Sequence, residues 1–240
     1  MTIPKLLQLA RDNASKSKPL RAEASGDETT LYMHGVIGGF WGDIDETEFA
    51  KTLAGITTGT IHLRIDSPGG DVFAARAMMT AIAQHSAKVI AHVDGMAASA
   101  ATGICMACDE VEISQGAGFM IHNAWTVAIG NKSDMLDTAA LLEKIDAGLA
   151  SDYARRTGKT SDDVVALMDA ETWFTADEAV ENGFADRKVE VVKERSKSTW
   201  NLSAYKNAPK TEKPEADDVD VAAFRNTLER RLSLLERAPA

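Results

Sequence analysis

The sequence predicts a layered α/β domain. Short β-prone runs, several almost continuous in apolar residues, alternate along the chain with stretches whose apolar residues recur at helical spacing. Strands of that kind are buried on both faces, and the intervening helices supply the layers that bury them. The chain has 240 residues, 45% of them hydrophobic, which is enough for one sizeable core with residues left over for tails.

Expected strands and helices alternate through the first half of the chain. The β-prone runs are LYMHGVI (31–37), TIHLRI (60–65), KVIAHV (88–93) and EVEI (110–113). Helical spacing occurs in DETEFAKTLAG (45–55) and DVFAARAMMTAIAQHS (71–86). This alternation indicates a single α/β unit.

The second half predicts helices followed by a last strand. A long amphipathic helix is expected from its N-cap at Ser133 to Gly158. Its apolar stripe consists of Leu142, Ile145, Leu149 and Tyr153. A shorter helix is expected in SDDVVALMD, and Thr175 with Glu178 forms a capping box for ADEAVEN, which ends at Gly183. FADRKVEVV then predicts a strand.

Composition divides the chain into three parts. Residues 1–28 are mostly polar, and we expect an N-terminal arm that becomes ordered only against a partner. Residues 29–192 form the main domain, and the polar, proline-containing stretch from 193 predicts a linker within 193–240. A final helix would align Phe224, Leu228, Leu232 and Leu235. That helix either binds a partner or stands alone with a solvated charged face.

Charge and hydropathy exclude several classes of partner. The net charge of −10 and the pI near 5.0, without a concentrated basic face, argue against binding to nucleic acid. No run approaches the roughly 20 apolar residues that span a bilayer, and the opening stretch is too short for a secretory signal. We therefore expect a soluble, cytoplasmic protein without a membrane partner.

The two cysteines, Cys105 and Cys108, form a C-x-x-C pattern. No second pair of ligands follows, so the sequence predicts no zinc site. Their place in the small, apolar stretch SAATGICMACDE favours packing in the core, with a redox role as the alternative.

The segment IDSPGGDVFAA (65–75) predicts a buried strand that ends in Ser-Pro-Gly-Gly just before a helix. Adjacent glycines let backbone N–H groups point into open space, and a helix start adds its positive dipole end. Such a turn suits an oxyanion, although a plain strand-to-helix turn also favours these residues. A phosphate-binding loop is excluded, because no Gly-Lys-Ser/Thr follows.

In VDGMAASAATGICMA (93–107) a strand ends at Gly95 and a helix of small residues begins around Ser99. This turn would present the Ser99 hydroxyl at a helix N-terminus, with the N–H of Ala100 close enough to help bind an oxyanion. Ser99 could equally be a helix cap.

His122 ends a short apolar strand in GAGFMIHNAW (116–125), 23 residues after Ser99. A serine hydroxyl needs a neutral imidazole within hydrogen-bond reach to take its proton, and His122 is the candidate. The alternative is a packed, hydrogen-bonded histidine, a description that fits the remaining four better still: His34, His62, His85 and His92.

Taken together, SPGG, G-x-A-A-S and MIH resemble the ClpP serine peptidases in their order and spacing. The resemblance continues into ETWFTADEAVENGFAD (171–186) and covers about residues 30 to 190. It is closest to the ClpP-related head-maturation proteases of phages and prophages. It implies a ClpP/crotonase-like fold of repeated β-β-α units with a long protruding helix, and makes 29–192 a peptidase domain.

The same resemblance implies roles for individual residues. Ser99 would be the nucleophile and His122 the general base, and the N–H groups of Gly70 and Ala100 would form the oxyanion hole. The family's aspartate position falls on Glu171.

Two further sets of residues follow from the resemblance. Asp169 competes with Glu171 as the carboxylate that orients the imidazole, and it is also open whether either contacts His122. Peptide substrate is expected to bind as an added strand at Gly69, Asn123, Ala124 and Trp125.

The implied function is a serine endopeptidase that works through an acyl-enzyme, alone or with an ATPase partner, and processes phage capsid or scaffold proteins. A homo-oligomeric ring of seven or fourteen copies is expected in the host cytoplasm or inside the procapsid, and no metal or organic cofactor is needed. The alternatives are an inactive ring-forming capsid-assembly protein and a crotonase-type acyl-CoA enzyme. A Ser/Lys dyad would have to use Lys88 or Lys132, neither of which lies in a motif.

Overall fold

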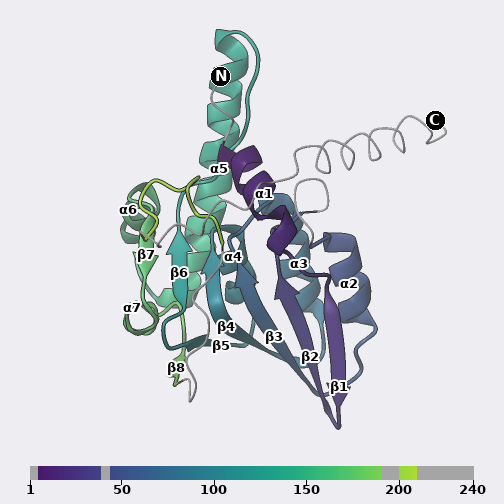
Figure 1. The fold of residues 1–240 in the computed structure, drawn as a ribbon. Coiled ribbons are helices and arrows are strands. Elements are labelled where there is room, and N and C mark those ends of the chain that lie inside the picture. The colour runs from purple at the N-terminus through teal and green to yellow at the C-terminus, as the bar shows by residue number, and fades with distance from the viewer. Residues whose placement is uncertain (1–4, 39–43, 191–199, 210–240) are drawn as a thin grey trace, which may run out of the picture. The chain divides into compact units, whose positions relative to one another are not determined.

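The computed structural model describes residues 5–38, 44–190 and 200–209. Within them, eight strands form one sheet in the order β1-β2-β3-β4-β5-β8, and β6 pairs with both β4 and β7 (Figure 1). The strands are β1 (Arg21–Ser25), β2 (Glu28–His34), β3 (Thr60–Ser67), β4 (Lys88–Ala98), β5 (Glu110–Ser114), β6 (Gly118–Ile121), β7 (Thr172–Phe174) and β8 (Arg187–Val189). The helices are α1 (Lys5–Asn13), the 3-10 turn η1 (Ala14–Lys16), α2 (Glu46–Ala54), α3 (Val72–Gln84), α4 (Ala100–Met106), α5 (Lys132–Thr157), α6 (Ser161–Asp169) and α7 (Ala176–Glu181). The α/β prediction is confirmed.

Most of the sheet is parallel, as helical crossovers require. β2, β3, β4, β5 and β8 pair in parallel, whereas β1 and β7 are antiparallel to their neighbours. β4 is the longest strand and has two partners on one side: its first half pairs with β5, and residues 96–98 pair with β6. The chain segments that leave β4 and β6 therefore lie next to each other.

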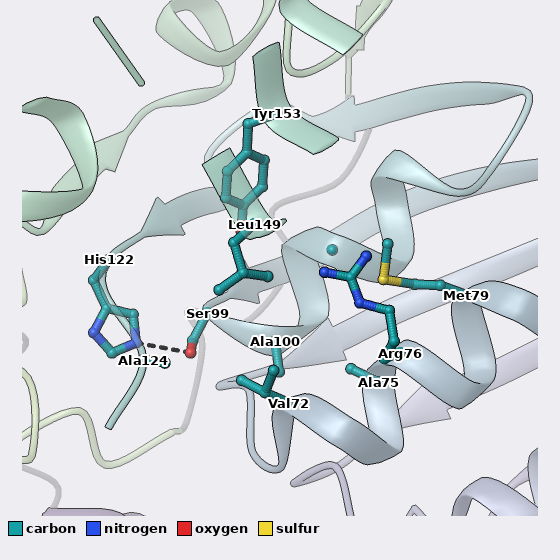
Figure 2. Close-up of a pocket in the computed structure, with 11 residues that line it drawn as sticks. Val72, Ala75, Arg76, Met79, Ser99, Ala100, His122, Ala124, Leu149 and Tyr153 are labelled. Carbon is teal, nitrogen blue, oxygen red and sulfur yellow. Dashed lines mark hydrogen bonds between the residues drawn. The ribbon is translucent and has the colours of Figure 1, made fainter. Parts of the chain in front are cut away.

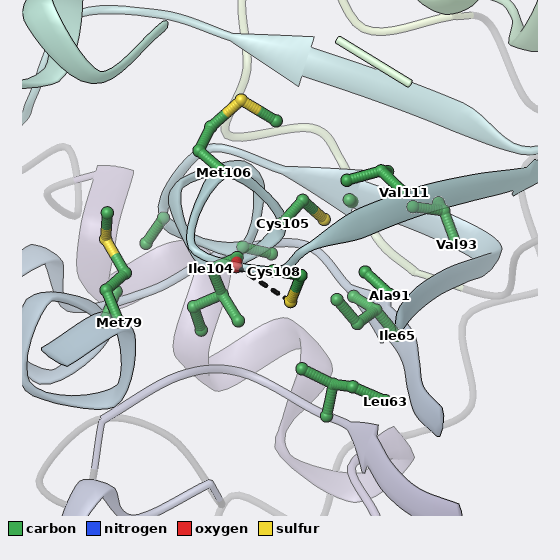
Figure 3. Close-up of a cluster of buried hydrophobic side chains, with 14 of the residues drawn as sticks. Leu63, Ile65, Met79, Ala91, Val93, Ile104, Cys105, Met106, Cys108 and Val111 are labelled. Carbon is green, nitrogen blue, oxygen red and sulfur yellow. Dashed lines mark hydrogen bonds between the residues drawn. The ribbon is translucent and has the colours of Figure 1, made fainter. Parts of the chain in front are cut away.

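The main core lies between the sheet and α4, as Figure 3 shows. Leu63, Val93 and Val111 of the strands pack around Ile104, Cys105 and Cys108. Both cysteines are free thiols, and they are 0% and 4% exposed. The C-x-x-C pattern is thus a packing feature in this structure.

Helix α5 runs farther than the sheet and projects away from it (Figure 1). Its N-cap is Asn131, two residues before the predicted one, because the Asn131 side chain accepts hydrogen bonds from the N–H groups of Ser133 and Asp134. It ends at Gly158, whose φ of 72° is left-handed, as expected. The predicted capping box of Thr175 and Glu178 is present at α7.

The two predicted tails differ from the structure. Residues expected to form an N-terminal arm that becomes ordered only against a partner make α1 and β1 within this chain, and β1 pairs with β2 along its whole length. Beyond the predicted boundary at 192/193, residues 200–208 belong to the same compact unit as the sheet. The predicted C-terminal helix lies outside the described residues.

No helix in the described part of the chain is long and apolar enough to cross a membrane. Within the same residues, no group of three or more His, Cys, Asp or Glu side chains is arranged to hold a metal ion.

Candidate active site

Ser99 occupies a sharp turn between β4 and α4. Its φ of 54° and ψ of −125° are unusual for a residue with a side chain, so the turn is strained. The flanking Ala98 and Ala100 are buried and small, which lets a strand and a helix meet at one residue. The N–H of Ser99 donates to the carbonyl of Met120 at 2.9 Å, and this bond anchors the turn to β6. Strained turns between a strand and a helix expose the nucleophilic serine in α/β-hydrolases.

The sheet brings His122 to Ser99. Because Ala98 pairs with Met120, the residues that follow each strand come together. His122 Nε2 lies 2.7 Å from Ser99 Oγ, and the two side chains point toward each other in Figure 2. This is the hydrogen bond through which an imidazole can take the proton of a serine hydroxyl.

His122 is only 7% exposed. Burial lowers its pKa from 6.5 to about 4, the nearby charge of Glu171 partly opposes that shift, and Lys5 adds to it. The imidazole is therefore neutral at neutral pH and free to accept a proton.

The SPGG turn lies directly beside Ser99. A Cβ on Gly69 would come within 2.8 Å of the Ser99 Cβ, and one on Gly70 within 2.1 Å of the Ile37 carbonyl oxygen, so both positions require glycine. Gly70 has a φ of 151° and forms a bridge with Ile37. Neither the N–H of Gly70 nor that of Ala100 donates to another residue that the structure describes. Ala100 directly follows the Ser99 turn, and Gly70 lines the same groove as Ser99.

Neither predicted carboxylate hydrogen-bonds to His122 among the described residues. Glu171 is 9% exposed and accepts hydrogen bonds from the backbone N–H groups of Lys206 at 3.0 Å and Asn207 at 2.6 Å. Asp169 accepts one from the Asn123 side chain at 2.7 Å. Glu171 acts on the imidazole through its charge, since it raises the His122 pKa, whereas Asp169 has no comparable effect on that pKa.

Two cavities meet at Ser99 and His122. The first is mostly apolar and is lined by residues of α3, α4 and α5, including Val72, Met79, Leu149 and Tyr153 (Figure 2). The second is a groove lined by Gly70, Trp125, Leu142, Ile145 and Tyr205 among others. The first cavity has room for about one water molecule, so the groove is the part of the site that suits an extended chain.

Of the four predicted substrate-binding residues, Ala124 and Trp125 line this groove, whereas Gly69 and Asn123 do not. Trp125 stacks edge-on against His122, with ring centroids 4.5 Å apart. The N–H of Ala124 donates to Asp146 at 2.7 Å, so that group is already satisfied within the chain. Asn123 is tied to Asp169, as noted above.

One aromatic residue of the site lies outside every predicted motif. Tyr205 is 5% exposed and packs against His122 with ring centroids 5.3 Å apart. It lies in WNLSAY (200–205), where Trp200, Leu202 and Ala204 are buried. This alternation of apolar and polar residues is the signal that could have identified a packed, extended segment.

Comparison with known proteins agrees with this geometry. The family model described as Clp protease matches residues 53–193. Over 128 residues the chain is 32% identical to the ATP-dependent Clp protease proteolytic subunit 2 of Tropheryma whipplei, covering 52% of this chain and 71% of that protein. It is 33% identical to the proteolytic subunit 1 of Leifsonia xyli and 34% identical to the subunit of Bacteroides fragilis, again over 128 residues. These last matches span 65% and 62% of the relatives, somewhat less than two thirds of their length.

Among solved structures, a ClpP1 mutant from Listeria monocytogenes has a similar fold, with a TM-score of 0.60 and 20% sequence identity. The similarity covers 68% of this chain and 92% of that one. At this identity the likeness establishes the shared fold.

Proposed function

The chain belongs to the Clp protease family of serine-type peptidases, and from that premise we propose that it hydrolyses peptide bonds through an acyl-enzyme formed on Ser99. The observation that carries the proposal is the 2.7 Å hydrogen bond between Ser99 Oγ and His122 Nε2, made beside two backbone N–H groups that donate to no residue in the described part of the chain. His122 is the general base, and Gly70 with Ala100 form the oxyanion hole.

The reaction follows from these positions. His122 Nε2 takes the proton of Ser99 Oγ as that oxygen attacks the peptide carbonyl carbon, and the N–H groups of Gly70 and Ala100 stabilise the resulting oxyanion. The imidazolium gives its proton to the leaving nitrogen, the C–N bond breaks, and the acyl group stays on Ser99. Water, deprotonated by His122, then attacks the ester and releases the acid.

Substrate would lie along the groove at Ala124 and Trp125, and the predicted contacts Gly69 and Asn123 are the chain neighbours of the groove residues Gly70 and Ala124. Glu171 is the third member of the site in this proposal, because its charge favours the imidazolium that forms during the reaction.

The expected substrates are capsid or scaffold proteins of a phage, on the strength of the resemblance of the three motifs to head-maturation proteases. A homo-oligomeric ring in the host cytoplasm belongs to the same proposal. Helix α5 supports it, since Met135, Leu136 and Leu141 expose large apolar side chains that pairing of two copies would bury. Light scattering should give a multiple of the chain mass, and a monomer would count against the ring.

Labelling with a fluorophosphonate tests the central proposal. Intact mass and peptide mapping should show a single adduct on Ser99 that is absent in Ser99→Ala and strongly reduced in His122→Ala. No adduct on the folded protein would favour the inactive assembly protein, and binding of CoA would favour the acyl-CoA enzyme.

The substrate proposal needs its own experiment. Capsid precursor and scaffold protein of a tailed phage, incubated with the protein and with Ser99→Ala, should be cut only by the former. The opposite result is that the protein cleaves an unfolded general substrate in the presence of an ATPase partner and leaves the capsid proteins uncut. That result would favour a housekeeping Clp subunit.

A further inference from the structure

A short segment after the predicted domain boundary lies against the active site. We call residues 200–208 the strap. Its buried residues Trp200, Leu202, Ala204 and Tyr205 pack in a second apolar cluster with Leu9, Met96, Ala98 and Met120. The cluster thus includes Ala98, which immediately precedes Ser99, and Met120, two residues before His122.

Polar contacts fix the strap in place. The buried side chain of Asn13 donates to the carbonyl of Asn201 at 2.9 Å and accepts from its N–H at 2.6 Å. The indole N–H of Trp200 donates to Asp66 at 2.8 Å. Paired bonds to a fully buried amide define one position for the strap.

Tyr205 is the strap residue that reaches the catalytic pair. Its ring meets the His122 ring edge-on at 90°, and Trp125 meets the same imidazole at 77°. Its hydroxyl donates to the carbonyl of Pro68, the residue that precedes Gly69 and Gly70. Burial raises the pKa of Tyr205, so the phenol stays protonated and keeps this donor. One side chain therefore contacts the general base and the loop that carries an oxyanion donor.

The next strap residues hold the carboxylate. The N–H groups of Lys206 and Asn207 both donate to Glu171, and the Asn207 side chain donates to the carbonyl of Ala170. These bonds account for the direction in which Glu171 points: toward the strap, without a hydrogen bond to His122.

We propose that Tyr205 is a positioning residue of the peptidase, which fixes the plane of the His122 imidazole by edge-on packing where the family's carboxylate would do so by a hydrogen bond. This inference rests on the proposed function of Ser99 and His122. Tyr205 also ties the imidazole to the Pro68–Gly70 turn, so that base and oxyanion hole keep one relative geometry.

The strap does not act as a cover in this structure. Ser99 is only half-buried and lines the open groove with the strap in place. The Ser99–His122 hydrogen bond, 2.7 Å long, is also present while the strap is in place. A segment that blocked the site would bury the nucleophile or break this bond.

Two charged groups, together with burial, act on the charge state of His122 from the elements packed around it. Glu171, just before β7, favours the imidazolium, and Lys5 of α1 disfavours it. The largest effect is burial, to which the rings of Tyr205 and Trp125 contribute. Removing the Tyr205 ring should let water reach the imidazole and return its pKa toward 6.5.

The test compares Tyr205→Ala and Tyr205→Phe in the full chain, with Phe49→Leu as a control that disturbs a buried aromatic residue of α2. NMR of labelled histidine follows the His122 titration, and the rate of fluorophosphonate labelling follows Ser99 reactivity. Tyr205→Ala should titrate at higher pH and label at least about tenfold more slowly at neutral pH, because the base is misaligned. Tyr205→Phe keeps the ring but loses the hydroxyl that contacts the Pro68 carbonyl and Ser99, so the His122 titration should stay near that of the parent while labelling slows less than in Tyr205→Ala. Phe49→Leu should lower stability and leave the His122 titration unchanged.

Either of two results would overturn the proposal. A Tyr205→Ala variant with an unchanged His122 titration and labelling rate would make the tyrosine a packing residue only. Faster labelling in that variant would make the strap a cover. If the parent protein does not label at all, the proposed function fails, whereas the NMR titration still decides whether Tyr205 holds the imidazole.

Discussion

Ser99 Oγ and His122 Nε2 are hydrogen-bonded at 2.7 Å although they come from turns 23 residues apart in sequence. The contact depends on the pairing of β4 with β6, which aligns Ala98 with Met120. The Ser99–His122 pair is thus a consequence of the register between β4 and β6. The burial of His122 lowers its pKa and keeps the imidazole neutral.

The buried imidazole makes stability depend on pH. The His122 pKa falls from 6.5 to about 4 on folding because of burial, so between these values the unfolded chain binds more protons than the folded one. Stability should therefore fall as pH drops through this window, by about 3 kcal/mol over its full width. Urea unfolding at both ends of the window measures this loss, and in His122→Gln the loss should be smaller by that amount. Equal losses in the two proteins would show that His122 is hydrated in the fold.

The strained backbone at Ser99 should lower the free energy of unfolding, in a turn that the proposed activity requires. Its φ of 54° suits glycine, so Ser99→Gly should be more stable than Ser99→Ala by about 1 kcal/mol, after the greater chain entropy of glycine is allowed for. Both variants should be inactive, since both lack the hydroxyl. Urea unfolding of the pair measures the difference, and the strain is absent if Ser99→Ala is the more stable.

The glycine at the proposed oxyanion hole should tolerate no side chain. A Cβ at Gly70 would lie 2.1 Å from the Ile37 carbonyl oxygen, so Gly70→Ala must shift the loop and its N–H. Cleavage of a peptide substrate should slow by about 100-fold or more. Gly26→Ala is the control, because Gly26 also has a positive φ of 63° but has no atom within 4 Å of the added Cβ. It should cost about 1 kcal/mol and leave the rate unchanged, and equal rates in both variants would remove Gly70 from the mechanism.

Much of the fold could be predicted because the inner strands and their helical connections have clear spacing. β4 is rich in apolar or small residues, whereas β3 buries every second residue. β1 gave no such signal, since all five of its residues are exposed and its only support is pairing with β2. Local patterns do not report backbone pairing at a sheet edge.

At the site, short motifs indicated Ser99, His122 and the glycines, because each of these residues is recognised by its immediate neighbours in the sequence. The orientation of Glu171 could not be predicted, since it depends on backbone N–H groups at Lys206 and Asn207, 35 and 36 residues away. The role of Tyr205 was missed for the same reason. The alternation in its segment indicates burial but does not identify the residues that it packs against, because that packing exists only after the sheet has formed.

Glu171 and Asp169 should differ in their effect on the base. Glu171→Gln keeps most of the local shape but removes the charge that raises the His122 pKa, so labelling at neutral pH should slow by about tenfold. Asp169→Asn changes a contact with Asn123 on the exposed side, and the rate should stay within about threefold. A larger loss in Asp169→Asn than in Glu171→Gln would reverse the assignment of the third residue.

The cysteines should be unreactive in the folded protein. Burial raises the pKa of Cys105 to about 12 and that of Cys108 well above its usual range, and neither thiol reaches solvent. Because the thiolate is the reactive form, iodoacetamide at neutral pH should modify neither residue in the native state and both after unfolding in guanidinium. Mass spectrometry counts the adducts, and Ser99→Ala serves as a control whose thiols should behave in the same way. Native modification of either cysteine, or a disulfide between them, would revive the redox interpretation of the C-x-x-C pattern.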